Sequence, residues 1–167
     1  MEITEIESAI IERLKSKITD LLVEGYPDDP ESYKLLHPKG ALLVRYSNST
    51  YSDPDSMGVV SQDRKMEFEV NVVARNLKNR KDKEARAGAY EYLEAVRYAL
   101  AGFKISGINK MFPTRDGFVK EEGGIWVYAM AFATSTVAVE IEEEELLPLL
   151  TRVTFVNDIT GDTEVVE

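Results

Sequence analysis

The chain has 167 residues, of which 44% are hydrophobic, and it carries a formal net charge of −10. This length suits one ordinary domain with a real core, and the apolar fraction argues against global disorder. Cysteine is absent, which excludes disulfides, thiolate catalysis and zinc–thiolate sites. The acidic balance disfavours binding of nucleic acid by charge neutralisation.

The sequence contains no apolar run long enough for a membrane-spanning helix. The first ten residues, MEITEIESAI, carry acids where a secretory signal requires bases. We therefore expect neither a membrane partner nor an export signal.

An amphipathic helix is expected at the N-terminus. Thr4 and Glu7 have the spacing of a capping box, and Gly25 is expected to end the helix. Apolar residues recur between them at helical spacing: Ile6, Ile10, Leu14, Ile18 and Leu21.

Residues 26–46, YPDDPESYKLLHPKGALLVRY, predict one short helical turn followed by a strand. The Asp29-Pro30 pair suits the cap and the first position of the turn. Pro38 and Gly40 are expected to end it. Ala41 to Tyr46 is then an apolar run of strand length.

The polar stretch Ser47 to Asp63 is expected to be a long loop, either functional or disordered. Lys65 to Arg75 alternates as a half-buried strand, antiparallel to the first. One face of this strand carries Met66, Phe68, Val70, Val72 and Ala74. The other face carries Glu67, Glu69, Asn71 and Val73.

Lys78 to Lys83 predicts a basic turn, and Asp82 can cap a second helix that runs to about Leu100 and stops at Gly102. Its expected apolar stripe is Ala85, Ala89, Leu93, Val96 and Leu100. Val119 to Thr136 predicts a hairpin that turns at Glu122-Gly123-Gly124. Its second strand is apolar on both faces, so we expect cover on both sides, by helices on one and by loops or a neighbouring subunit on the other.

The C-terminal part differs in composition. Glu140 to Glu145 is nearly continuous acid, and Arg152–Val156 and Thr163–Val166 flank a turn rich in Asn, Asp and Gly. This predicts an appended hairpin on a linker. The whole chain thus reads as α+β: an antiparallel sheet with two helices packed on one face, plus the C-terminal hairpin. We expect a single domain over 1–136 and an acidic linker with its hairpin over 137–167.

The inventory of catalytic groups is poor. His37 is the single histidine and lacks the companions of a transition-metal site, so a packing or hydrogen-bonding role is favoured. The segment 53–58, DPDSMG, resembles the start of a calcium loop, but Met57 and Arg64 stand where calcium ligands belong. Asp28, Asp29 and Glu31 are better explained by helix capping than by paired catalytic carboxylates.

The acidic run 140–145 is read as a solvated linker, although it could bind a cation or a basic partner. One basic patch favours a protein partner or solvation over DNA; it comprises Arg75, Lys78, Arg80, Lys81, Lys83 and Arg86. Trp126 and Tyr128 have the strand spacing of core residues. We therefore assign no catalytic, cofactor-binding or metal residue and expect no cofactor. A pocket lined by Glu67, Glu69 and Tyr128 would instead indicate a small enzyme or ligand-binding module.

Two stretches of the sequence resemble a tail protein family of Mu-like phages and prophages, the gene-product-thirty-seven type. They are residues 26–46, quoted above, and MFPTRDGFVKEEGGIWVYAMAFAT, residues 111–134. The resemblance also includes the N-terminal helix, the strand leading into Ala74-Arg75-Asn76-Leu77 and the second helix at Gly88-Ala89-Tyr90. It covers much of the chain from Ile3 to about Thr134, and we could place nothing from Val137 onward.

The resemblance implies a structural protein of tail assembly and not an enzyme. The family is similar to tail terminators or tail-completion proteins, whose subunits form a ring, commonly of six, on the tail tube. The implied partners are further copies of the chain, the tail tube protein and head connector proteins. The implied location is the host bacterial cytoplasm during assembly and then the virion tail. A head–tail connector (neck) subunit is the alternative within the structural class.

Overall fold

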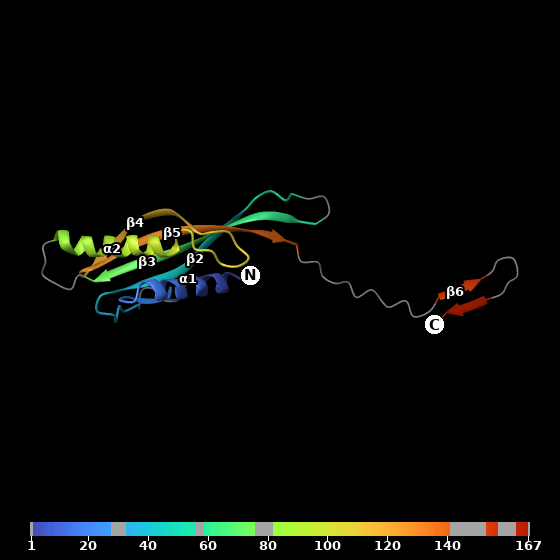
Figure 1. The fold of residues 1–167 in the computed structure, drawn as a ribbon, viewed down its shortest axis with the longest axis horizontal. Coiled ribbons are helices and arrows are strands. Elements are labelled where there is room, and N and C mark those ends of the chain that lie inside the picture. Colours follow the sequence, from blue (N-terminus) through green and yellow to red (C-terminus); the bar gives the residue numbers. More distant parts are fainter. Residues whose placement is uncertain are drawn as a thin grey trace.

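The computed structural model describes residues 2–27, 33–55, 59–75, 82–140, 153–156 and 163–166, with the backbone alone for 82–87 and for the last two ranges. Within these residues, five strands form one sheet and two helices cover one of its faces (Figure 1). The fold therefore belongs to the α+β class, as the sequence predicts.

The elements follow in chain order as α1 (Ile3–Lys17), β1 (Leu22–Gly25), β2 (Gly40–Tyr51), β3 (Ser61–Arg75), α2 (Asp82–Leu100), β4 (Phe112–Glu122), β5 (Ile125–Val139), β6 (Val153–Val156) and β7 (Thr163–Val166). Across the large sheet the order is β1–β2–β3–β5–β4. β1 is parallel to β2, and the other neighbours are antiparallel.

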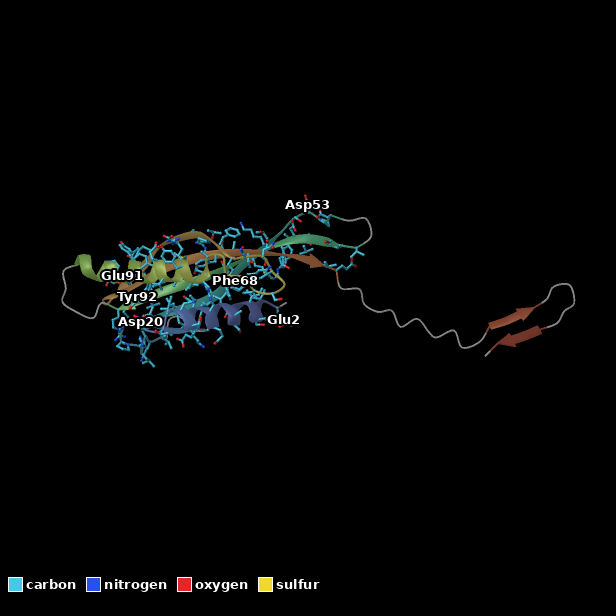
Figure 2. All side chains as sticks on the ribbon, in the orientation of Figure 1. Glu2, Asp20, Asp53, Phe68, Glu91 and Tyr92 are labelled. Carbon is cyan, nitrogen blue, oxygen red and sulfur yellow. The ribbon has the colours of Figure 1, made fainter. Side chains whose placement is uncertain are left out.

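The main core lies between the two helices and the sheet. Phe68 and Phe132, opposite each other on β3 and β5, are completely buried at its centre (Figure 2 labels Phe68). Both helices contribute their predicted stripes, since α1 buries Ile6, Ile10 and Leu14, and α2 buries Ala89, Leu93, Val96 and Leu100. The side chain of Ala85 lies outside the described residues.

The start of α1 differs from the predicted capping box. The helix begins at Ile3, and the backbone N–H of Glu2 donates to Glu5 Oε2 at 2.8 Å. Glu2 and Glu5, which have the same three-residue spacing, therefore form the capping box that was predicted for Thr4 and Glu7. Glu7 is turned toward the sheet, where its Oε2 accepts a hydrogen bond from the N–H of Tyr46 at 3.3 Å.

The end of α1 was also wrongly predicted. The helix stops at Lys17, and Ile18 is already extended. Ile18 and Leu21 are buried, as their spacing suggests, but they anchor the connection that leads into β1. Gly25 lies in that strand and does not end the helix. Because β1 runs parallel to β2, the sheet is mixed and not purely antiparallel.

The connection between β1 and β2 is only partly described. The expected helical turn at Asp29-Pro30 lies outside the described residues, and residues 33–36 have no helical assignment. Its last part carries Leu35, which is buried against Ala41, Leu43 and Val73 on the sheet. This segment therefore covers one end of the face that the helices leave open.

Both ends of the expected long loop from Ser47 to Asp63 are strand. β2 continues to Tyr51 and β3 begins at Ser61, with Thr50 opposite Lys65. The residues are polar because no helix covers this part of the sheet, so the sequence lacks the alternation of a core strand. In Figure 1 these strand ends form a twisted extension beyond the helices. We use this name for residues 47–55 and 59–63 together with residues 135–139 of β5, which pair with β3 there.

From β3 onward the chain follows the predictions more closely. The predicted inward face of β3 is buried from Met66 to Ala74. The strand is not half-buried as predicted, because Glu69, Asn71 and Val73 on its other face are buried too. Gly102 ends α2 with φ of +78°. Gly123 and Gly124 have φ of +58° and +80° and join β4 to β5 in a two-residue turn. The basic turn falls largely outside the described residues.

At the C-terminus, β6 and β7 pair with each other and form a separate antiparallel sheet, as predicted. The turn between them lies outside the described residues. β5 continues to Val139, beyond position 137, where the acidic linker was expected to begin.

Candidate functional site

The side of the large sheet that faces away from the helices is the candidate functional surface. We call it the outer face. The strand register brings Arg45, Glu69 and Ala131 into one row across β2, β3 and β5, and Leu43, Asn71 and Ala129 into the next. Because β5 contributes the short side chains of alanines there, the outer face is recessed along β5. Longer side chains from β2, β3 and β4 lie on either side of this recess.

A network of charged groups occupies the centre of the outer face. The side chain of Glu69 is only 7% exposed, and its Oε1 accepts hydrogen bonds from Arg45 at 2.6 and 3.0 Å and from Asn71 at 3.2 Å. Arg115 on β4 reaches Oε2 of Glu69 at 3.4 Å and Glu67 at 3.1 Å. The network joins three strands around the nearly buried carboxylate of Glu69, which would be costly to leave unpaired.

Beside this network lies a hollow of about 520 Å³, which we call the outer groove. It is lined by Tyr26, Pro27, Tyr33, Leu35, Leu43, Asn71, Val73, Lys120, Glu122, Ile125 and Val127. Its floor is the apolar end of the sheet, and its rim is the turn between β4 and β5. The guanidinium of Arg45 stacks over the ring of Tyr26, 4.9 Å from its centroid, and so connects the network to the groove.

One wall of the outer groove carries a perturbed tyrosine. The hydroxyl of Tyr33 donates to Glu24 Oε1 at 3.0 Å. Burial raises the pKa of Tyr33 to about 12, and the hydrogen bond and negative charge of Glu24 act in the same direction. Tyr33 is therefore a neutral hydrogen-bond donor near neutral pH, a state suited to holding the segment in place and not to acting as a base.

The three residues whose convergence would indicate an enzyme do not converge. Glu67 and Glu69 lie on the outer face, whereas Tyr128 lies opposite Val72 on the helix side. There Tyr128 packs edge-on against Tyr90 of α2 and Phe118 of β4. Trp126 packs against the same core, as the strand spacing predicts.

His37 has the hydrogen-bonding role favoured from the sequence. Its Nδ1 accepts from the N–H groups of Lys39 and Gly40 at 3.3 and 3.4 Å. The nitrogen thereby fixes the bend that leads into β2.

The candidate acidic sites are only partly described. Asp53 lies in the described residues, whereas positions 56–58 of the calcium-like segment and the Asp28, Asp29 and Glu31 cluster lie outside them. Of the acidic run, Glu140 is described: its Oε2 accepts from the N–H of Val60 at 2.9 Å. Within the described part of the chain, no group of three or more His, Asp or Glu side chains is placed to hold a metal ion. Of the basic patch, Arg75 is described and donates to the carbonyl of Leu35.

A second kind of surface lies on the twisted extension and along β4. Large apolar side chains are exposed on the twisted extension, namely Tyr51, Val59, Val60, Val137 and Val139, and on β4, namely Phe112, Phe118 and Val119. Exposed apolar groups gathered in this way mark surfaces that bind other proteins. No described helix is long and apolar enough to cross a membrane.

The sequence reasoning missed the Arg45–Glu69–Arg115 network. It placed Glu67 and Glu69 on the less apolar face of their strand, and it expected β2 and β3 to be antiparallel. The sequence does not give the register between β2 and β3, and only this register shows that Arg45 lies opposite Glu69.

The architecture is thus a helix layer on a mixed sheet whose second face carries polar groups and a groove. Residues 10–157 match the family model described as Gp37 protein. The chain belongs to the Gp37 family, which confirms the family resemblance drawn from the sequence. The match also extends beyond Thr134, where that resemblance was thought to end.

One solved structure with the same fold is a chain in the virion of a native gene transfer agent particle. It is 13% identical, with a TM-score of 0.50, and the alignment covers 80% of this chain and 95% of that one. No curated protein matches the sequence.

Proposed function

We propose that this chain is a structural subunit of a phage-type virion, and more specifically a tail-terminator or tail-completion protein that forms a ring on the tail tube. The family match over residues 10–157 carries the proposal. The fold shared with a chain of a gene transfer agent virion supports it, because that chain is itself part of a virion.

The exposed surfaces suit a subunit that binds copies of itself. A closed ring requires head-to-tail contacts in which two different patches of the same chain meet. The twisted extension, with Val137 and Val139 each 57% exposed, supplies one patch, and the outer face supplies another. The Arg45–Glu69–Arg115 network supplies polar groups that select a partner by electrostatic fit.

The proposed partners are further copies of the chain, in a ring of about six as in proteins of this kind, the tail tube protein and the head connector proteins. The proposed mode of action is binding without catalysis and without a cofactor. The groups that could do chemistry support this, since Glu69, Tyr33 and His37 are each held in hydrogen bonds to neighbouring parts of the fold. The proposed location is the host cytoplasm during assembly and the virion tail afterwards.

Binding to tail tubes tests the proposal. Purified chain would be mixed with assembled tail tubes and with portal or neck complexes from the same phage or prophage, and the products viewed by negative-stain electron microscopy. We expect rings at tube ends and an arrest of tube growth. Binding to portal complexes alone would replace the proposal with a connector role, and binding to neither would overturn both.

A further inference from the structure

The two strands at the C-terminus form a unit that is too small to stand alone. β6 and β7 have four residues each and pair from Val153↔Val166 to Val156↔Thr163. A two-stranded hairpin is marginally stable at best in water and needs a third element to cover it. Most of its residues are apolar: Val153, Phe155, Val156, Val165 and Val166.

The outer groove is a surface of matching character. Ile125 and Val127 on its floor are only partly buried, and they pack beside the buried Leu43 and Val73. Lys120 and Glu122 on the rim carry charges of opposite sign, and Glu164 is the one charged residue of the two hairpin strands.

The length of chain decides which copy of the groove the hairpin can occupy. β5 runs from Val127 in the groove to Val139, which is about 40 Å at roughly 3.3 Å per residue. Residues 141–152 connect the body to β6, and twelve residues span at most about 40–43 Å when fully extended. To reach its own groove, the linker would therefore have to run back nearly straight along most of β5.

A neighbouring copy removes this constraint, because its groove can lie close to the end of β5. We infer that the β6–β7 hairpin of one copy docks into the outer groove of the next copy. This inference rests on the proposed function and names a contact that holds the assembly together. Hairpin and groove are different patches, so the contact is head-to-tail and can close into a ring.

The absence of cysteine makes a crosslinking test clean. Thr154→Cys would be made in unlabelled protein and Lys120→Cys in ¹⁵N-labelled protein, at the groove rim where the Lys120 side chain is 63% exposed. The matched control is ¹⁵N-labelled Lys15→Cys on α1, which is 50% exposed and lies on the helix side. The mixtures would be oxidised at high protein concentration and again on tail tubes, and linked peptides identified by mass spectrometry.

We expect the mixed light–heavy link between positions 154 and 120 to exceed the link between 154 and 15 about tenfold or more, through the raised effective concentration. Equal yields from both mixtures would overturn the inference. A double variant, Thr154→Cys with Lys120→Cys, would be diluted into excess unmodified chain. If the yield of the 154–120 link falls on dilution, the link forms between copies and supports the inference. If the yield does not fall, the link forms within one chain and the inference is overturned.

The two proposals fail separately. Tube binding without the 154–120 link would leave the proposed function in place and overturn the hairpin contact. The 154–120 link without tube binding would support the hairpin contact and overturn the proposed function.

Discussion

Glu69 is the residue on which the centre of the outer face depends. Its nearly buried carboxylate gathers Arg45, Arg115 and Asn71 from three strands, and no helix shields it. Such a buried carboxylate stabilises the fold only while its partners remain, because without them its negative charge would be left unpaired.

Removing this carboxylate is expected to destabilise the chain measurably. We expect Glu69→Ala to lower the free energy of unfolding by about 1–3 kcal/mol, since Arg45 and Asn71 lose a shared acceptor. The control is Glu12→Ala, which breaks an exposed pair with Lys15 and is expected to cost less than about 0.5 kcal/mol. Urea unfolding of both variants makes the comparison, and equal losses would show that the network contributes nothing special.

Tyr33 gives a second test at this scale, through pH. An unfolded tyrosine loses its proton near pH 10, whereas Tyr33 in the fold does so at about 12. Because the folded pKa is the higher one, its stabilising effect is fully present below about pH 10 and is lost as the pH rises toward 12. We expect Tyr33→Phe to flatten the fall in unfolding free energy between pH 10 and pH 11.5.

The measurement is urea unfolding at several alkaline pH values, with an absorbance titration of tyrosinate alongside. The variant should lack one tyrosine that titrates late. Parallel pH profiles for the variant and the original chain would contradict the role given to burial and to Glu24.

At the scale of the elements, Gly40 shows how closely β2 lies against β3. A Cβ placed there would lie 2.2 Å from the carbonyl oxygen of Val73 and 3.3 Å from Ala74 Cα. Both are backbone atoms, so the strands themselves would have to separate. By contrast, a Cβ at Gly117 on β4 would meet no atom within 4 Å.

This contrast defines a matched pair of substitutions. We expect Gly40→Ala to cost about 2–3 kcal/mol, as an overpacked site that forces the backbone to shift. Gly117→Ala should change the free energy of unfolding by about 0.5 kcal/mol or less. Thermal unfolding followed by circular dichroism compares them. A harmless Gly40→Ala would mean that β2 and β3 are less closely joined than the structure shows.

Much of the element pattern could be predicted from residues. Met66 to Ala74 alternates so regularly that only a strand accommodates it, and Ala89 to Leu100 has the spacing of a helix packed on one side. β1 could not be predicted, because Leu22–Gly25 is short and continues the apolar spacing of α1 without a break. Its strand character comes from pairing with Ala41–Val44, a contact between segments that local sequence does not report.

The candidate site was harder to predict than the fold. Arg45 and Glu69 are ordinary charged residues on their own strands, and only the antiparallel register joins them. The outer groove needs even more, since its walls come from the β1–β2 connection, β3 and the β4–β5 turn. Sequence periodicity assigns faces to strands but not the alignment between them.

At the scale of the whole molecule, the body and the C-terminal hairpin are expected to separate cleanly. Among the residues whose side chains are described, both buried clusters form without Ala133 to Glu140, the last part of the body. We therefore expect a chain truncated after Glu140 to keep its circular dichroism spectrum and to lose no more than about 0.5–1 kcal/mol of stability.

The same truncated chain should assemble poorly, because it lacks the segment that docks on the neighbouring copy. Sedimentation velocity at matched concentrations measures this. A truncated chain that unfolds would mean that residues beyond Glu140 belong to the core, and would contradict the expected separation.

Strand β4 forms one of the two edges of the large sheet. β4 begins with Phe112-Pro113 and shifts register against β5 twice, between Pro113 and Arg115 and between Phe118 and Lys120. Proline has no amide hydrogen to offer a new strand, and each irregularity twists the edge away from a straight template. At this edge the proline and the two irregularities disfavour pairing with a strand of another molecule, while contacts through the faces of the sheet stay open.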